Sequence, residues 1–132
     1  MTKKIVEFLH AKREYFYFVF RIAIGFLFLL HGLNKFELIG AGQIELMGRL
    51  GLAAVIEGVA GLLIILGLFV RYTAVITAVE MIFAYFLVHA SRAISPLSNG
   101  GEPAVLFFLA FLVLIGFGAR KWSLDSLIEG RR

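Results

Sequence analysis

Residues 50–90 hold the stretch that decides the fold: LGLAAVIEGVAGLLIILGLFV at 50–70, then Arg71, then YTAVITAVEMIFAYFLVHA at 72–90. A helix needs about 20 apolar residues to cross a hydrocarbon core of ~30 Å, and both runs have about that length. The turn at 67–73 is so short that the two helices are expected to be antiparallel neighbours. The stretch therefore predicts a helical hairpin in a membrane.

Two further apolar runs flank this hairpin. One covers residues 15–36, and the other, AVLFFLAFLVLIGFGA at 104–119, contains no ionisable residue and is slightly short for a span. We therefore expect an all-α membrane protein, a four-transmembrane-helix bundle that forms a single domain over 1–132. The four predicted helices cover residues 15–36, 50–70, 72–90 and 104–119.

The remaining segments predict surface structure. Lysines alternate with apolar residues at 2–14, and Ser123 can cap a short helix at 124–130, so surface helices are expected at both places. The glycine-broken segment 37–48 predicts an interfacial or re-entrant stretch. Residues 91–103 predict an irregular loop, with Pro103 in the first turn of the fourth helix.

Composition excludes several classes of protein. Of the 132 residues 61% are hydrophobic and 17% are charged, and the mean hydropathy is +0.93. These values exclude a soluble globule and a disordered chain. The sequence has no cysteine, which excludes disulfides, thiolate catalysis and iron–sulfur clusters within this chain.

The basic residues predict the orientation of the bundle. Three of them, Lys35, Arg49 and Arg92, flank the two longer links, and the other ten lie toward the opposite ends of the runs. These ten are Lys3, Lys4, Lys12, Arg13, Arg21, Arg71, Arg120, Lys121, Arg131 and Arg132. By the positive-inside rule both termini should face the cytoplasm, in a cell membrane. This arrangement does not favour nucleic acid as a partner, because the charges do not form one stripe.

Four ionisable residues inside the predicted spans are candidates for a ligand-binding site. They are His31, Lys35, Glu57 and Glu80. A charge within a span costs about 2.5–3.5 kcal/mol, so each needs a partner or a wet cavity. Glu57 can pair with Lys35 or His31 at similar depth, either as a structural ion pair or as a ligand or proton site. Glu80 can be hydrogen-bonded through the threonines of its helix, or it can be a neutral, protonated acid.

Two other polar residues predict structural roles. Arg21 is expected to snorkel to the inner boundary, and Thr77 to hydrogen-bond within the bundle near Glu80. No pair of ligands has the spacing of a metal site on a helix, so no metal is predicted. Most of the phenylalanines are expected to face lipid, although a few could line a pocket for a flat ring.

The polar and glycine positions together resemble the DoxX family of small four-helix membrane proteins, over roughly residues 21–125. The shared motifs comprise Arg21 with Gly25, His31-Gly32 with Lys35, Glu57-Gly58 with Gly61, Gly67 with Arg71, Gly116 with Gly118, and Ser123-Leu124-Asp125. One difference is that Ala119–Trp122 separate the last glycine from Ser123, slightly more residues than the pattern has.

The resemblance implies a quinone-facing or redox-partner subunit and fixes no reaction. The expected function is an accessory subunit that binds a quinone-like molecule or a redox protein, with no other cofactor predicted. Two alternatives are a structural or assembly factor of a membrane complex and a small proton-coupled transporter acting as a homo-oligomer. The absence of an acid from the first helix and the strong charge asymmetry disfavour the transporter.

Overall fold

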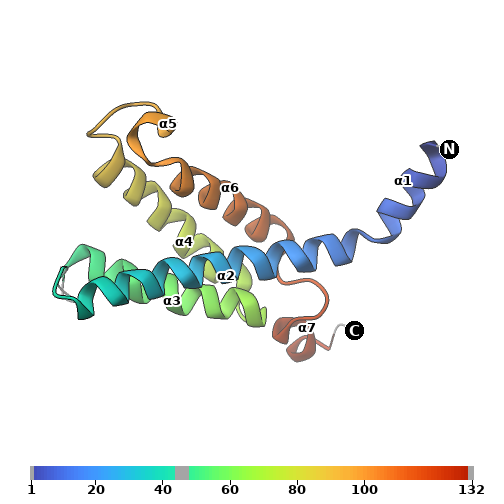
Figure 1. The fold of residues 1–132 in the computed structure, drawn as a ribbon. Coiled ribbons are helices and arrows are strands. Elements are labelled where there is room, and N and C mark those ends of the chain that lie inside the picture. The colour runs from blue at the N-terminus through green and yellow to red at the C-terminus, as the bar shows by residue number, and fades with distance from the viewer. Residues whose placement is uncertain (1, 44–47, 131–132) are drawn as a thin grey trace.

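The computed structural model describes residues 2–43 and 48–130, and within them all regular structure is helical (Figure 1). The elements in order are α1 (Thr2–Ala11), α2 (Arg13–Gly40), α3 (Arg49–Leu66), α4 (Val70–Ala84), the π-helical turn η1 (Tyr85–His89), α5 (Pro96–Asn99), α6 (Glu102–Phe117) and α7 (Leu124–Ile128). All-helical structure agrees with the fold class that the sequence predicts.

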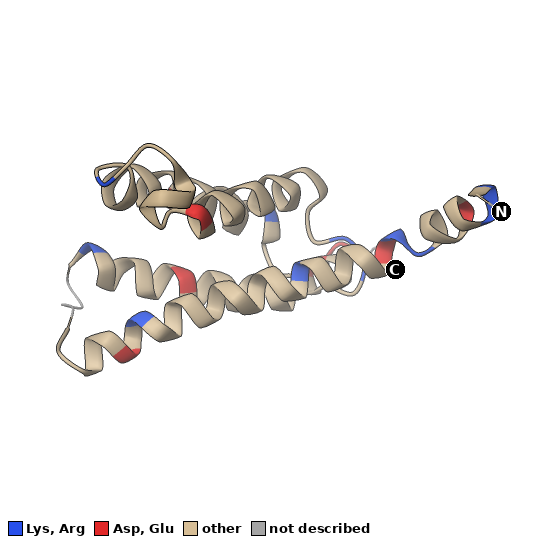
Figure 2. Ribbon diagram, turned by 45° about the horizontal axis from the view of Figure 1, so that its top comes forward, with Lys and Arg blue, Asp and Glu red and all other residues tan. Residues whose placement is uncertain are grey.

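The four long helices form two pairs. α2 packs along α3, and α4 packs along α6, while α3 and α4 also touch. The pairs separate toward one end in both views (Figures 1 and 2). We call the end that carries α1, α7 and the α3–α4 turn the terminal end, and the end that carries α5 the loop end. The core between the pairs contains Phe28, Ile64, Met81 and Phe111.

Three described helices are long and apolar enough to span a membrane. They are Arg13–Gly40, Arg49–Leu66 and Val70–His89, with 28, 18 and 20 residues. α6 is also apolar but has only 16 residues, about 24 Å at 1.5 Å per residue. At most 33% of the residues in each spanning window are buried, so most of the apolar surface would face lipid. A count of four spanning helices therefore remains a prediction.

Several helix ends differ from the expected ones. α2 continues to Gly40, so residues 37–40 are helical, and the rest of the predicted re-entrant stretch partly lies outside the described residues. α3 ends at Leu66 because Gly67 adopts a left-handed conformation with φ 69°. The predicted irregular loop 91–103 instead contains one helical turn, α5. Pro103 does lie in the first turn of α6.

The expectation for Arg21 is wrong. Its side chain is fully buried rather than snorkelling, and it donates to the Ala119 carbonyl at 2.8 Å and to the Trp122 carbonyl at 2.6 Å. Tyr17 donates to the Gly118 carbonyl as well. Two residues of α2 therefore hold the loop 118–123 that follows α6. These carbonyls accept from the two terminal nitrogens of the guanidinium, whereas its Nε is buried without a hydrogen-bond partner among the described residues.

The same loop leads into α7. Ser123 accepts a hydrogen bond from the Ser126 amide at 3.1 Å, which confirms the predicted cap. Asp125 accepts from the Phe69 amide at 2.8 Å and from the Val70 amide at 3.1 Å. This carboxylate caps the start of α4, whose N-terminal residues include no cap of their own.

Glycines set the spacing of α2 and α3. A methyl group on Gly61 would overlap the backbone of Leu29 and lie 2.8 Å from the Gly25 carbonyl oxygen. A methyl group on Gly32 would overlap the backbone at Gly58. Backbone lies against backbone at both points, so neither helix can yield by rotating a side chain. Small residues allow this approach, which is how helices gain packing energy in lipid.

Replacing Gly61 by alanine should destabilise the folded chain by about 1–3 kcal/mol, because α2 and α3 must move apart. The thermal unfolding midpoint in detergent measures this loss. Gly58→Ala is the matched control on the same helix, since its new methyl group would meet only the Phe36 ring, at 3.6 Å. Both changes gain the same helix propensity. Equal midpoints for the two variants would contradict the packing described above.

Candidate functional site

The candidate site begins with an ion pair between the two closely packed helices. The Lys35 ammonium of α2 hydrogen-bonds to Oε2 of Glu57 in α3, which confirms one of the two predicted pairings. The Glu57 side chain is only 6% exposed and that of Lys35 is 22% exposed. Lys35 lies one turn beyond Gly32, and Glu57 precedes Gly58, so the glycine contact places the two charges together.

Glu80 of α4 lies near this pair but is bonded to neither member. Its carboxyl group interacts electrostatically with both Glu57 and Lys35. Both carboxyl oxygens are buried, and neither has a hydrogen-bond partner in the part of the chain that the structure describes. A buried polar group without a partner costs about 1–3 kcal/mol. Of the two acids Glu57 and Glu80, Glu80 is therefore the one whose carboxyl group forms no hydrogen bond with residues 2–43 and 48–130.

The threonines do not serve Glu80. The Thr77 hydroxyl is buried and hydrogen-bonds to its own helix, 3.0 Å from the Thr73 carbonyl and 3.2 Å from the Ala74 carbonyl. Thr77 therefore bonds within its own helix, and the predicted hydrogen bond between Thr77 and Glu80 is not formed. Back-bonding of this kind is the common state of threonine in a helix, because the i−4 carbonyl is always within reach.

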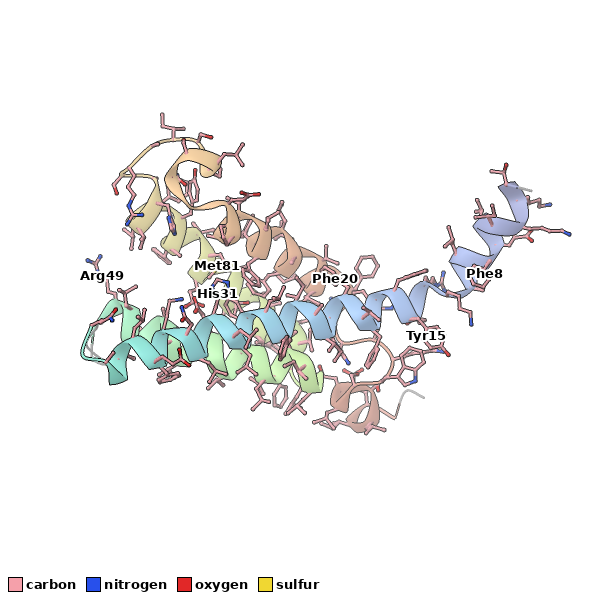
Figure 3. All side chains as sticks on the ribbon, in the orientation of Figure 1. Phe8, Tyr15, Phe20, His31, Arg49 and Met81 are labelled. Carbon is pink, nitrogen blue, oxygen red and sulfur yellow. The ribbon has the colours of Figure 1, made fainter. Side chains whose placement is uncertain are left out.

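His31 lies one turn before Lys35 on α2 and faces α6, not Glu57. Its ring is exposed and meets the Phe107 ring edge-on at a centroid distance of 5.2 Å. Figure 3 labels His31 on α2. Phe107 is part of an aromatic cluster with Phe28 and Phe111, at 5.1 Å and 5.9 Å. The imidazole makes no hydrogen bond to any described residue, so its ring nitrogens are available to a ligand.

The arrangement thus combines hydrogen-bonding groups with flat apolar walls. Lys35, Glu57 and Glu80 provide charge and donors, and the phenylalanine cluster with His31 lies beside α2. Among the described residues no three His, Asp or Glu side chains gather as metal ligands. Together these side chains can hold a proton or donate a hydrogen bond to a carbonyl oxygen of a ligand.

Sequence reasoning missed a second polar cluster, at the loop end. The buried Asn99 donates to the Ala93 carbonyl at 2.8 Å and accepts from the Gly101 amide at 2.7 Å. It also contacts the Tyr85 hydroxyl at 3.3 Å, and His89 lies 3.2 Å from the Asn99 carbonyl. The Asn-Gly pair signals a turn but not burial. This cluster organises the link from η1 to α6.

The fold and this polar group define a small helical membrane protein with several apolar helices. Residues 16–90 match the DoxX family, and the chain belongs to it. An uncharacterized protein of Haemophilus influenzae is 39% identical over 126 residues, which cover 89% of this chain and 94% of that protein. No solved structure matches the chain.

Two further relatives carry more informative names. An uncharacterized membrane protein of Mycobacterium tuberculosis is 28% identical, over 93% of this chain and 87% of its own length. A Bacillus subtilis protein named "Putative oxidoreductase CatD" is 30% identical, over 82% of this chain and 83% of its own length. The similarity to membrane proteins agrees with the apolar helices.

The ion pair can be tested by a double-mutant cycle. Glu57→Gln alone leaves Lys35 as a partly buried charge without its partner and should cost up to about 3 kcal/mol. In a Lys35→Met background the same change should cost less, because no charge is left unpaired. Thermal unfolding of the four proteins in one detergent gives the coupling energy. Strictly additive effects would show that the two side chains do not interact.

Proposed function

We propose that the chain is an accessory subunit that binds a quinone-like lipophilic molecule beside Lys35, Glu57 and Glu80. The observation that carries this proposal is the Glu80 carboxyl group, which is buried without a hydrogen-bond partner among the described residues. A protein retains such a costly group inside a membrane chiefly where a ligand or a proton uses it. The name of the Bacillus subtilis relative supports the redox side of the proposal.

Each residue of the site has a role in this proposal. Lys35 and His31 donate hydrogen bonds to a carbonyl oxygen of the ligand. Glu57 holds Lys35 in place and accepts a proton, and Glu80 in its neutral form is a further donor. Quinones need an apolar slot and one or two polar contacts, and the Phe107 ring offers a flat wall next to His31.

The ligand reaches this site from the bilayer rather than through water. His31 is exposed on the surface of α2, among apolar residues that would face lipid. A lipid-soluble molecule can therefore approach sideways between the helix pairs. No electron-carrying group is needed in the chain itself, since a partner protein would supply it.

Glu80→Met should separate stability from binding. Removing the carboxyl group should raise the stability of the ligand-free protein by about 1–3 kcal/mol, because methionine needs no hydrogen bond. The same change should weaken the rise in melting temperature that a benzoquinone or naphthoquinone analogue causes in the unmodified protein. Melting curves at several quinone concentrations measure both effects.

Two substitutions and two controls locate the site. His31→Phe and Lys35→Met should weaken the quinone-dependent shift, whereas His10→Phe and Lys3→Met on the exposed helix α1 should leave it unchanged. A folded wild-type protein that shows no shift with several quinones would favour the assembly-factor function. A shift that survives both site substitutions would place the ligand elsewhere.

The orientation belongs to the same proposal: four helices span the cell membrane, and the terminal end faces the cytoplasm. Eight of the ten basic residues counted above are described, and they lie on α1, at the turn between α1 and α2, on α2, at the start of α4 or in the loop 118–123. Figure 2 shows basic residues on α1 and at the helix ends. A partner redox protein or a second copy of the chain would bind to the bundle in this orientation.

Cysteine labelling tests the orientation, since the natural sequence has no cysteine. A cysteine at Ser98, in α5, should react with a membrane-impermeant maleimide in intact cells, and a cysteine at Ser126, in α7, should react only after lysis. Labelling of the Ser126 position in intact cells would reverse the orientation.

A further inference from the structure

The terminal end contains a groove that the quinone proposal does not use. Its volume is about 890 Å³, and it lies between the starts of α2 and α4, the end of α6, and α7. We call it the terminal groove. Four basic residues line it: Arg13, Arg71, Arg120 and Lys121.

The carboxylates of the groove are largely engaged. Glu14 pairs with Arg120 through two nitrogens of the guanidinium, and with Arg13 at 3.7 Å. The hydrogen bonds that Arg120 donates to Glu14 raise the pKa of Arg120, which keeps that side chain cationic. Asp125 accepts the amides at the start of α4. Glu129 is the third acid of the lining.

Arg71 and Lys121 keep most of their donors. Arg71 donates one nitrogen to the Ile115 carbonyl at 3.0 Å, and its side chain is exposed. Lys121 is exposed and makes no hydrogen bond or ion pair with any residue in 2–43 or 48–130. Of the four cations that line the groove, these two form no ion pair with a carboxylate among the described residues.

Apolar side chains continue the groove toward the membrane. Phe69, Tyr72 and Val75 of the α3–α4 turn and α4 line it, together with Phe117 at the end of α6. All four are exposed large apolar or aromatic groups. The groove therefore has cations at its rim and exposed apolar residues along the adjoining helices. This pattern matches a phospholipid at the bilayer interface, which has a charged headgroup and apolar acyl chains.

The cationic rim is held in a fixed shape. The loop 118–123 is fastened by Tyr17 and Arg21, which bind three of its carbonyls. Arg120 and Trp122 both adopt left-handed backbone angles, with φ 54° and 53°. Such angles cost about 1 kcal/mol or more per residue and persist only where the surroundings enforce them. A rim fixed before binding loses less entropy when a ligand arrives.

From these observations we propose that the terminal groove binds the phosphate group of an anionic phospholipid from the adjacent leaflet. Arg71 and Lys121 donate to the phosphate oxygens, and the acyl chains lie along Tyr72, Val75 and Phe117. The lipid anchors the terminal end at a defined depth. This site is at the opposite end of the bundle from Lys35 and Glu57, so it stands independently of quinone binding.

The test uses the full chain purified in a neutral detergent. Phosphatidylglycerol should raise the melting temperature in a concentration-dependent way, and phosphatidylcholine with the same acyl chains should raise it less. Lys121→Gln should weaken the apparent affinity about fivefold, and Arg71→Gln with Lys121→Gln about 25-fold, because each cation near a lipid surface contributes comparably. Lys121 forms no hydrogen bond or ion pair with a described residue, so its single variant is expected to fold normally.

The paired variant Lys3→Gln with Lys4→Gln is the matched control, because it removes two exposed cations of α1 outside the groove. It should change the apparent affinity by less than about twofold. An equal loss in this control would mean general attraction between charges and would overturn the site. Equal shifts with both lipids, or a shift that inorganic phosphate alone reproduces, would overturn the assignment to a phospholipid.

Discussion

The close approach of α2 to α3 is the constraint on which the rest of the structure depends. At Gly32 and Gly61 each helix lies against the backbone of the other, with no room for a methyl group. In lipid the association of helices gains little from apolar burial, so such contacts carry much of the packing energy. The same register brings Lys35 against Glu57, two charges that neither helix could hold alone in a membrane. Packing and electrostatics are therefore satisfied by one arrangement of two helices.

Two polar environments with different chemistry follow from this core. The Lys35–Glu57 pair is internally neutral and borders Glu80, whose carboxyl oxygens remain unpaired among the described residues. The terminal end instead uses arginines to hold backbone carbonyls, so that Arg21 is buried yet bonded. The first environment suits a small hydrogen-bonding molecule from the bilayer, and the second suits a fixed anion at its surface. Membrane helices tolerate charge where one of these solutions is available.

The sequence predicts the apolar helices, the cap at Ser123 and the Lys35–Glu57 contact, because length, local spacing and depth determine them. It fails where a partner lies far along the chain. Arg21 was expected to snorkel to the inner boundary, but its side chain is buried, and its acceptors are 98 and 101 residues away along the chain. The short link between α3 and α4 predicts that these two helices are neighbours. In the structure α3 packs mainly on α2, and α4 packs mainly on α6. Small residues, rather than adjacency in sequence, decide which helix faces meet. The single turn of α5 is too short for periodicity to reveal.

The bonds of Arg21 also impose an order on assembly. Domains fold largely from the N-terminus during synthesis, so α2 enters the membrane long before residues 119 and 122 are made. Until then the guanidinium has none of its final carbonyl acceptors, and α4 has no Asp125 at its first amides. The segment after α6 thus supplies partners to a helix that is synthesised much earlier. A chain released before residues 119–122 are made would hold an arginine in α2 without these two acceptors.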